Sequence, residues 1–287
     1  MANLKEIRSR ITSVGSTMQI TSAMKMVSAA KLKRAQDSIT QLRPYANKLS
    51  QLLGNLTSSI DISSGGAYSQ KRDVKRVLLV PITSNRGLCG GFNSYILKKT
   101  ISLIKDDFSN AKVSIVSIGK KSSEYFEKNG YNVVGRHDSL FLDLSFDNVS
   151  KVADKIMQSF IEGEVDTVVL VYNQFKNAAT QIIMAENFLP VESNNKEEVM
   201  QSDYIFEPQK EQIIEQLIPK SLKTQLYKAV LDSHAAEHGA RMTAMHKATD
   251  NAAELKKELT LTYNKARQAA ITGEILEIVG GAEALNG

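Results

Sequence analysis

The chain has 287 residues, of which 42% are apolar and 23% charged, and its formal net charge is +5 at pH 7. No apolar run approaches the roughly 20 residues with which a helix crosses a bilayer, and the charged N-terminus lacks an apolar core, so we expect neither a membrane-spanning helix nor a secretion signal. The single cysteine, Cys89, excludes an internal disulfide and suits a reducing compartment, so we expect a cytosolic-type chain that can still contact a membrane-bound partner.

The first 48 residues are strongly basic. They hold nine lysines and arginines but only two acidic residues, whereas residues 49–219 have a small acidic excess. Such a basic segment could bind a partner that carries phosphates or an acidic protein surface. A solvated helix face would explain the positive charge equally well.

An N-terminal helix is predicted from Asn3 onward, because the segment up to Arg43 has no proline and one glycine. Pro44 marks a natural place for a kink or a stop. Apolar residues recur at alternating spacings of three and four, which predicts a coiled-coil seam. The spacing is interrupted once, between Met18 and Met24, as at a stutter. The predicted seam residues are Leu4, Ile7, Ile11, Val14, Met18, Met24 and Val27. We expect a coiled-coil helix over residues 1–55 and a polar, glycine-rich linker over residues 56–73.

The middle of the chain, residues 74–208, alternates short β-branched apolar segments with helical patterns. Strands are predicted over residues 74–84, 112–119, 166–175 and 180–191. Helices are predicted over residues 94–108, 120–129 and 146–163, and a short one over residues 209–218. This alternation is typical of an α/β domain with a mostly parallel sheet.

The C-terminal segment, residues 209–287, reads as one more coiled-coil helix. Gly239 lies inside it at a cost of about 1 kcal/mol. Its seam residues are predicted as Met242, Met245, Thr249, Ala252, Leu255, Leu259, Thr262 and Ala266. Sixty helical residues would reach about 90 Å, more than a compact domain of this size can span, so we expect the two ends of the chain to pair as a long antiparallel coiled coil. The small seam residues suit a slender shaft that sits inside another structure.

The stretch "SNRGLCGGFNS", residues 84–94, follows a predicted strand and precedes a predicted helix, which is the arrangement of a phosphate-binding loop. It lacks the lysine and hydroxyl residue that end a Walker loop, and the spacing of Gly87, Gly90 and Gly91 does not fit the dinucleotide pattern. A tight turn or a protein contact is therefore favoured over a nucleotide site, and no cofactor is expected.

Other catalytic candidates are weak. Cys89 needs a histidine base to act as a nucleophile, and His137 is the only histidine of the α/β segment. The motif "HAAEH", from His234 to His238, fits an inverted zinc-protease pattern, but it lacks a third ligand and falls on a helix that we expect to be exposed. The sequence therefore gives no support for an enzyme.

Nearly the whole chain resembles the gamma subunits of F-type ATP synthases. The resemblance rests on "QITSAMKMVSAAKLKRAQ" near the N-terminus, "SNRGLCGGFN" and "DYIFEP" in the middle, and "ARMTAMHKATDNA" and "YNKARQAAITGEILEIVGGAEAL" at the end. It implies a central rotor shaft, with a Rossmann-like α/β domain that has no nucleotide site beside an asymmetric coiled coil. It also implies that the subunit helps to regulate activity, holds no catalytic residue, and works through the alpha and beta subunits, the epsilon subunit and the c-ring.

The resemblance carries over a set of contact residues. Those expected to contact the beta subunits are Met24, Lys25, Lys31, Arg34, Arg86, Arg241, Met242, Arg267, Gln268, Thr272 and Glu274. Those expected to contact the c-ring and epsilon are Tyr204 and Glu207. The implied location is the cytoplasmic face of a bacterial plasma membrane, as a peripheral subunit.

Two other classes of protein stay open from the residues alone. A basic coiled coil that binds nucleic acid would explain the N-terminal charge, but Tyr45 is the only aromatic residue in the first 48. An α/β nucleotide enzyme with helical arms would need the loop motif that is missing here. No nucleic-acid partner is therefore expected.

Overall fold

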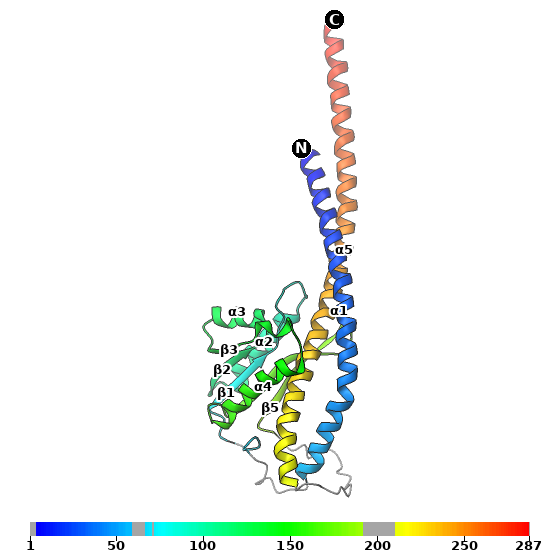
Figure 1. Cartoon of the computed structure of the whole chain (residues 1–287). Coiled ribbons are helices and arrows are strands. Elements are labelled where there is room, and N and C mark those ends of the chain that lie inside the picture. The colour runs from blue at the N-terminus through cyan, green and yellow to red at the C-terminus, as the bar shows by residue number, and fades with distance from the viewer. Residues whose placement is uncertain (1–3, 59–66, 71, 192–209, 287) are drawn as a thin grey trace. The chain divides into compact units, whose positions relative to one another are not determined.

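The computed structural model describes residues 4–58, 67–70, 72–191 and 210–286. The chain divides into two compact units, one made of residues 1–28 with 242–287 and the other of residues 29–241. Two long helices, α1 (Leu4–Ser58) and α5 (Lys210–Asn286), contribute to both units (Figure 1). The expected domain boundaries at residues 55, 73 and 208 stay predictions, and the compact units divide both long helices.

The larger unit is built on a five-stranded sheet in the order β3-β2-β1-β4-β5 (Figure 1). The strands are β1 (Arg76–Pro81), β2 (Lys112–Ser117), β3 (Val133–Arg136), β4 (Thr167–Phe175) and β5 (Gln181–Leu189). The first four are parallel and β5 runs antiparallel to β4. This confirms the α/β prediction, although β3, a short edge strand, was not predicted.

Helices cover both faces of the sheet because side chains of β1 alternate between two cores. One core places Leu78 and Val80, with Ile82 directly after the strand, against apolar side chains of α4 (Phe146–Ile161) and α5. The other places Val77 and Leu79 against α2 (Phe92–Ser102) and the π-helical turn η2 (Leu103–Asp107). The remaining elements are α3 (Lys120–Lys128) and the short 3-10 helix η3 (Asp138–Phe141). Burial on both faces explains why β1 reads as a continuous apolar run.

Neither proline ends a helix. α1 continues through Pro44 to Ser58, and α5 includes Pro219. The separately predicted short helix over residues 209–218 is therefore the first part of α5. Within the larger unit, buried residues of α1 keep the spacing of three and four through this region: Leu32, Ala35, Ile39, Ala46 and Leu49.

In the smaller unit the two helices pair side by side in antiparallel fashion (Figure 1). The Thr249 hydroxyl donates to the Thr21 hydroxyl oxygen at 2.8 Å, and the Lys256 side chain lies beside Gly15. Ile7, Met245 and Ala252 are buried. The predicted antiparallel pairing is thus confirmed.

Three predicted seam positions are wrong. Val27 and Leu255 are about half exposed, and Thr262 is exposed. The seam of α5 instead keeps the strict spacing of three and four, so after Ala252 the partly buried residues are Lys256, Leu259, Tyr263 and Ala266. Lysine can occupy such a position because its aliphatic stem packs while its ammonium group stays in water.

Candidate functional site

The glycine-rich turn between β1 and α2 is held by side chains of its own segment. Asn93 accepts a hydrogen bond of 2.9 Å from the Ser84 amide, and its amide group donates to the Ser84 hydroxyl at 2.8 Å. The Ser84 hydroxyl in turn donates to the Arg86 carbonyl oxygen at 2.6 Å. Leu88 and Gly90 have positive φ angles, so the backbone turns sharply before α2 begins. Leu88 is left 65% exposed at the tip.

The sheet changes winding direction at β1, which lies between β2 and β4, and ligands of open α/β sheets bind at the carboxyl ends of such strands. In this chain, side chains of the turn, of α5 and of β4 fill the carboxyl end of β1. Cys89 and Phe92 pack against Ala236 of α5, and the Ser233 hydroxyl donates to the Ile82 carbonyl oxygen at 3.4 Å. From β4, the Asn173 amide donates to the Phe92 carbonyl oxygen at 3.1 Å. The turn is therefore a packing element against α5, which supports the prediction that it is no phosphate cradle.

A buried ion pair on α5 holds the same turn. The Arg241 guanidinium lies 2.6 Å from a carboxylate oxygen of Glu237, one helical turn earlier, and both side chains are about one-tenth exposed. The guanidinium also donates to the carbonyl oxygens of Arg86, at 3.1 Å, and Gly87, at 3.4 Å. Burial raises the pKa of Glu237 despite the neighbouring Arg241. Arg241, predicted as a beta-contact residue, is thus already engaged inside the chain.

The expected exposure of the "HAAEH" motif is wrong. His238 is buried, and the Nε2 atoms of His234 and His238 lie 3.1 Å apart. The His234 ring stacks on Phe141 at a centroid distance of 5.8 Å. Burial lowers the pKa of His234 to about 4 and that of His238 to about 3. In the part of the chain that the structure describes, no cluster of three or more potential metal ligands is found.

The predicted contact residues of α1 have accessible side chains. In the smaller unit, Met24 and Lys25 are half-buried. In the larger unit, Lys31 and Arg34 are exposed. The charge of Lys31 adds to the effect of burial in lowering the pKa of His234, and it partly opposes the effect of burial that raises the pKa of Glu237. Arg86 is exposed at the turn. Their roles stay predictions.

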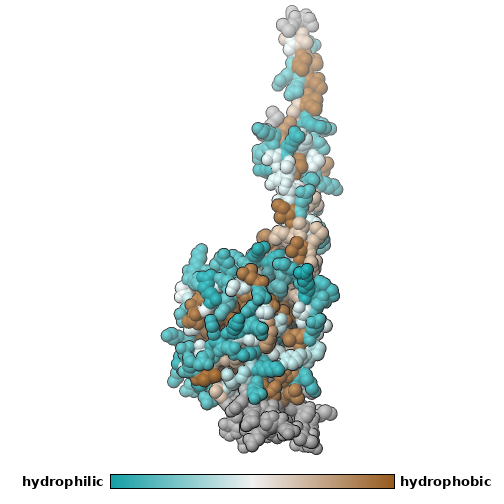
Figure 2. Space-filling view, viewed as in Figure 1, coloured by the Kyte–Doolittle hydropathy of each residue, from teal (hydrophilic) through white to brown (hydrophobic). Residues whose placement is uncertain are grey.

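The last part of α5 exposes both polar and apolar side chains. The predicted contact residues Arg267, Gln268, Thr272 and Glu274 are all exposed, whereas Met242, nearer the middle of the helix, is half-buried. Large apolar side chains lie among them, seen as brown atoms towards the C-terminal end of α5 in Figure 2: Ile271, Ile275, Leu276, Ile278 and Val279. Residues 271, 275, 278 and 279 share one helix face, so this stretch presents an apolar stripe. Tyr204 and Glu207 fall outside the described residues.

Sequence reasoning missed one ion pair, between a half-exposed arginine and a buried aspartate. The Asp232 side chain is fully buried in the larger unit, and one of its oxygens lies 3.6 Å from the Arg43 guanidinium of α1. Burial raises the pKa of Asp232, while Arg43 acts in the opposite direction. No spacing rule links positions so far apart in sequence. The Glu237–Arg241 pair, by contrast, has the i, i+4 spacing that a helix favours.

The sequence profile of the family described as ATP synthase matches residues 3–285. The chain is 63% identical to the ATP synthase gamma chain of Flavobacterium johnsoniae over 289 aligned residues, which cover the whole of both chains. The chain belongs to the ATP synthase gamma chain family. It is also 58% identical to the gamma chain of Christiangramia forsetii, again over the full length of both.

Solved structures agree with this assignment. A central stalk chain of Tetrahymena thermophila mitochondrial ATP synthase is 26% identical, with a TM-score of 0.59, covering 80% of this chain and 99% of that one. A chain from the Euglena gracilis mitochondrial ATP synthase has a TM-score of 0.70 at 22% identity, covering 98% of this chain and 94% of that one, which shows the shared fold. None of the described helices is both long and apolar enough to span a membrane.

Proposed function

We propose that this chain is the rotor shaft of an F-type ATP synthase. It couples ion-driven rotation of the c-ring to the conformational cycle of the beta catalytic sites, and it supplies no catalytic residue of its own. The observation that carries this proposal is the exposed apolar stripe on the last part of α5. Its four large apolar side chains, at positions 271, 275, 278 and 279, are each about half exposed or more. Such a stripe is typical of a surface that another protein covers.

The mechanism follows from the asymmetry of the shaft. A shaft can shift the equilibrium of a beta subunit only if its different faces make different contacts with that subunit. The end of α5 offers such a difference, because the side of the helix opposite the apolar stripe carries the small residues Ala269 and Gly273 and the charged Glu277. Each beta subunit would meet these faces in turn as the shaft rotates, and its affinity for nucleotide would change accordingly.

The basic N-terminal helix suits the same role. Lys31 and Arg34 are exposed in the larger unit and can face acidic segments of beta, which gives the positive charge of residues 1–48 a partner. Tyr204 and Glu207 are proposed to meet the c-ring and epsilon, through which the chain would take part in regulation. The complex would place it at the cytoplasmic face of a bacterial plasma membrane as a peripheral subunit.

Rotation can be tested directly in a complex assembled with alpha and beta subunits. The substitution Lys98→Cys on α2 provides an exposed attachment point for a bead, and the native Cys89 does not compete because it is buried. With the beta subunits fixed to a surface, ATP should drive the bead in one direction, with pauses that reflect the threefold repeat of the beta sites. A complex that hydrolyses ATP at the normal rate while the bead stays still would refute the shaft proposal.

A further inference from the structure

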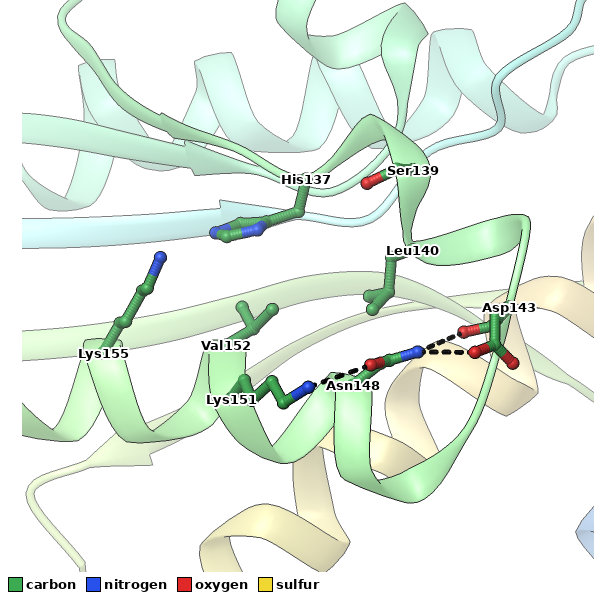
Figure 3. Close-up of a pocket in the computed structure, with 8 residues that line it drawn as sticks. All are labelled: His137, Ser139, Leu140, Asp143, Asn148, Lys151, Val152 and Lys155. Carbon is green, nitrogen blue, oxygen red and sulfur yellow. Dashed lines mark hydrogen bonds between the residues drawn. The ribbon is translucent and has the colours of Figure 1, made fainter.

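A hollow of about 270 Å³ lies in the larger unit, between the end of β3 and α4 (Figure 3). His137 and Ser139 contribute from the segment after β3, and Asn148, Lys151 and Lys155 contribute from α4. Ligand pockets for drug-sized molecules usually measure about 300–1,000 Å³. This hollow therefore suits a small ligand, smaller than a nucleotide.

The lysines reach the hollow because of their helical spacing. Asn148, Lys151, Val152 and Lys155 recur at i, i+3, i+4 and i+7 and so form one stripe along α4. Val152 is buried in the core beneath the hollow and fixes the orientation of the stripe. In Figure 3 the Lys155 ammonium group points towards the His137 ring. Lys155 and His137 thus lie together at one end of the hollow, and Lys151 lines it beside Asn148.

The acidic groups nearby are already engaged. Asp143, at the far end of the hollow, accepts a hydrogen bond of 2.9 Å from the Asn148 amide group. Asp138, next to His137, is paired with Arg136 at 2.7 Å and accepts from the Ser123 hydroxyl at 2.8 Å. Asp154 of α4 is paired with Lys223 at 2.8 Å. The positive end therefore keeps a surplus of hydrogen-bond donors.

The donors themselves have little to bind within the chain. Lys151 makes one long hydrogen bond of 3.5 Å to Asn148, and among the described residues Lys155 forms no ion pair. Burial, followed by the charge of Lys155, lowers the pKa of His137, while Asp138 acts in the opposite direction. An anion between these groups would relieve the repulsion between them and satisfy their donors.

We propose that this hollow binds a small phosphate-type dianion, either inorganic phosphate or a small phosphomonoester, between Lys151, Lys155 and His137. Two ammonium groups and an imidazole supply charge-assisted hydrogen bonds, which are stronger than neutral ones. The bound ion would link the segment after β3 to α4. It would also raise the pKa of His137, since a dianion stabilises the imidazolium.

The test is a titration of the full-length chain, labelled with ¹³C-histidine, with inorganic phosphate and with glycerol phosphate at constant pH. Potassium chloride at matched ionic strength is the reference, and the exposed His246 is the internal control. We expect a saturable shift of the His137 signal with phosphate and none with chloride. Glycerol phosphate distinguishes a site for phosphomonoesters, where it competes with phosphate, from one restricted to the inorganic ion.

Two variants decide whether the hollow is the site. Lys155→Gln should weaken phosphate binding about tenfold or more, because it removes a charged hydrogen-bond donor. Lys98→Gln, a matched change of an exposed helical lysine on α2, should leave the titration unchanged. Equal responses to phosphate and chloride, or an unaltered titration in Lys155→Gln, would overturn the proposal.

Discussion

The Arg241 guanidinium donates a hydrogen bond of 3.1 Å to the carbonyl oxygen of Arg86, 155 residues away in the sequence. The same guanidinium neutralises Glu237 within a buried pair. One side chain therefore ties α5 to the glycine-rich turn and compensates the charge of its neighbour. Four predictions about stability follow from this and related contacts.

Replacing Arg241 with alanine should destabilise the larger unit strongly. The change leaves the Glu237 carboxylate buried without its partner, and such losses cost about 3–5 kcal/mol. The measurement is the free energy of unfolding in urea. Arg267→Ala, at an exposed position of the same helix, should change it by less than about 0.5 kcal/mol. The double variant Glu237→Leu/Arg241→Met should recover much of the loss, and a fully additive double variant would contradict this account.

Stability should fall as the pH drops below about 6.5, because two histidines are buried in their neutral form. The folded-state pKa values of His234 and His238, about 4 and 3, lie below the ordinary value of 6.5. The unfolded chain then binds protons that the folded chain does not, so each histidine costs about 1.4 kcal/mol per pH unit between these limits.

The surrounding groups act on the same equilibrium. Lys31 and Arg241 oppose protonation of both histidines. Burial raises the pKa of Glu237, so its protonation stabilises the fold as the pH falls from that raised value to the ordinary 4.5. The variant His238→Gln isolates the histidine contribution. Its unfolding free energy should depend less steeply on pH than that of the native chain, and identical slopes would count against the assignment.

Gly239→Ala should fail to stabilise α5, although alanine favours a helix by about 1 kcal/mol over glycine. A Cβ atom at this position would lie 3.2 Å from the Ala178 carbonyl oxygen, in the turn between β4 and β5. The glycine thus allows two backbones to approach closely. Gly273→Ala is the matched control, because no atom lies within 4 Å of its added Cβ. The control should raise helix content by circular dichroism, and an equal gain in both variants would contradict the close contact.

Thr249→Val should loosen the pairing of the two helices in the smaller unit. It removes the hydroxyl that donates to Thr21 at 2.8 Å, a bond worth about 0.5–1.5 kcal/mol. Amide hydrogen exchange of the residues around Thr21 should become faster by a factor that corresponds to this loss of free energy. The reference is Thr260→Val, whose hydroxyl bonds only to the backbone of its own helix at Lys256. Equal acceleration in both variants would show that the bond between the helices contributes nothing.

The sequence revealed the order of the elements because their patterns are local. Heptad spacing marked α1 and α5, and β-branched runs marked β1, β2 and β4. The edge strand β3 was not predicted because it has only four residues and includes Gly135. Leu255 was wrongly predicted as a seam residue because it is more hydrophobic than Lys256. The periodicity of the helix and the space beside Gly15 place Lys256 in the seam instead.

The candidate site was less predictable because its contacts are long-range. The resemblance placed Arg241 on an outer contact surface, but nothing in its neighbourhood indicated that it would bind the backbone at Arg86. The motif from His234 to His238 was expected on an exposed helix, whereas this part of α5 packs against the sheet of the larger unit. Such burial depends on which elements meet in space, and the local pattern of α5 carries no signal of it.

The two sets of contacts along α5 have a consequence for how this gene can change. Contacts with the sheet domain reach as far as Gly239 and Arg241, and the seam begins at Met242. Inserting or deleting one residue between Gly239 and Met245 would turn everything downstream by about 100° around the helix axis. A substitution here alters the contacts of one side chain, whereas a change in length would put every later seam residue out of phase. Descendants of this chain should therefore keep the residue count of this stretch even where they replace its residues.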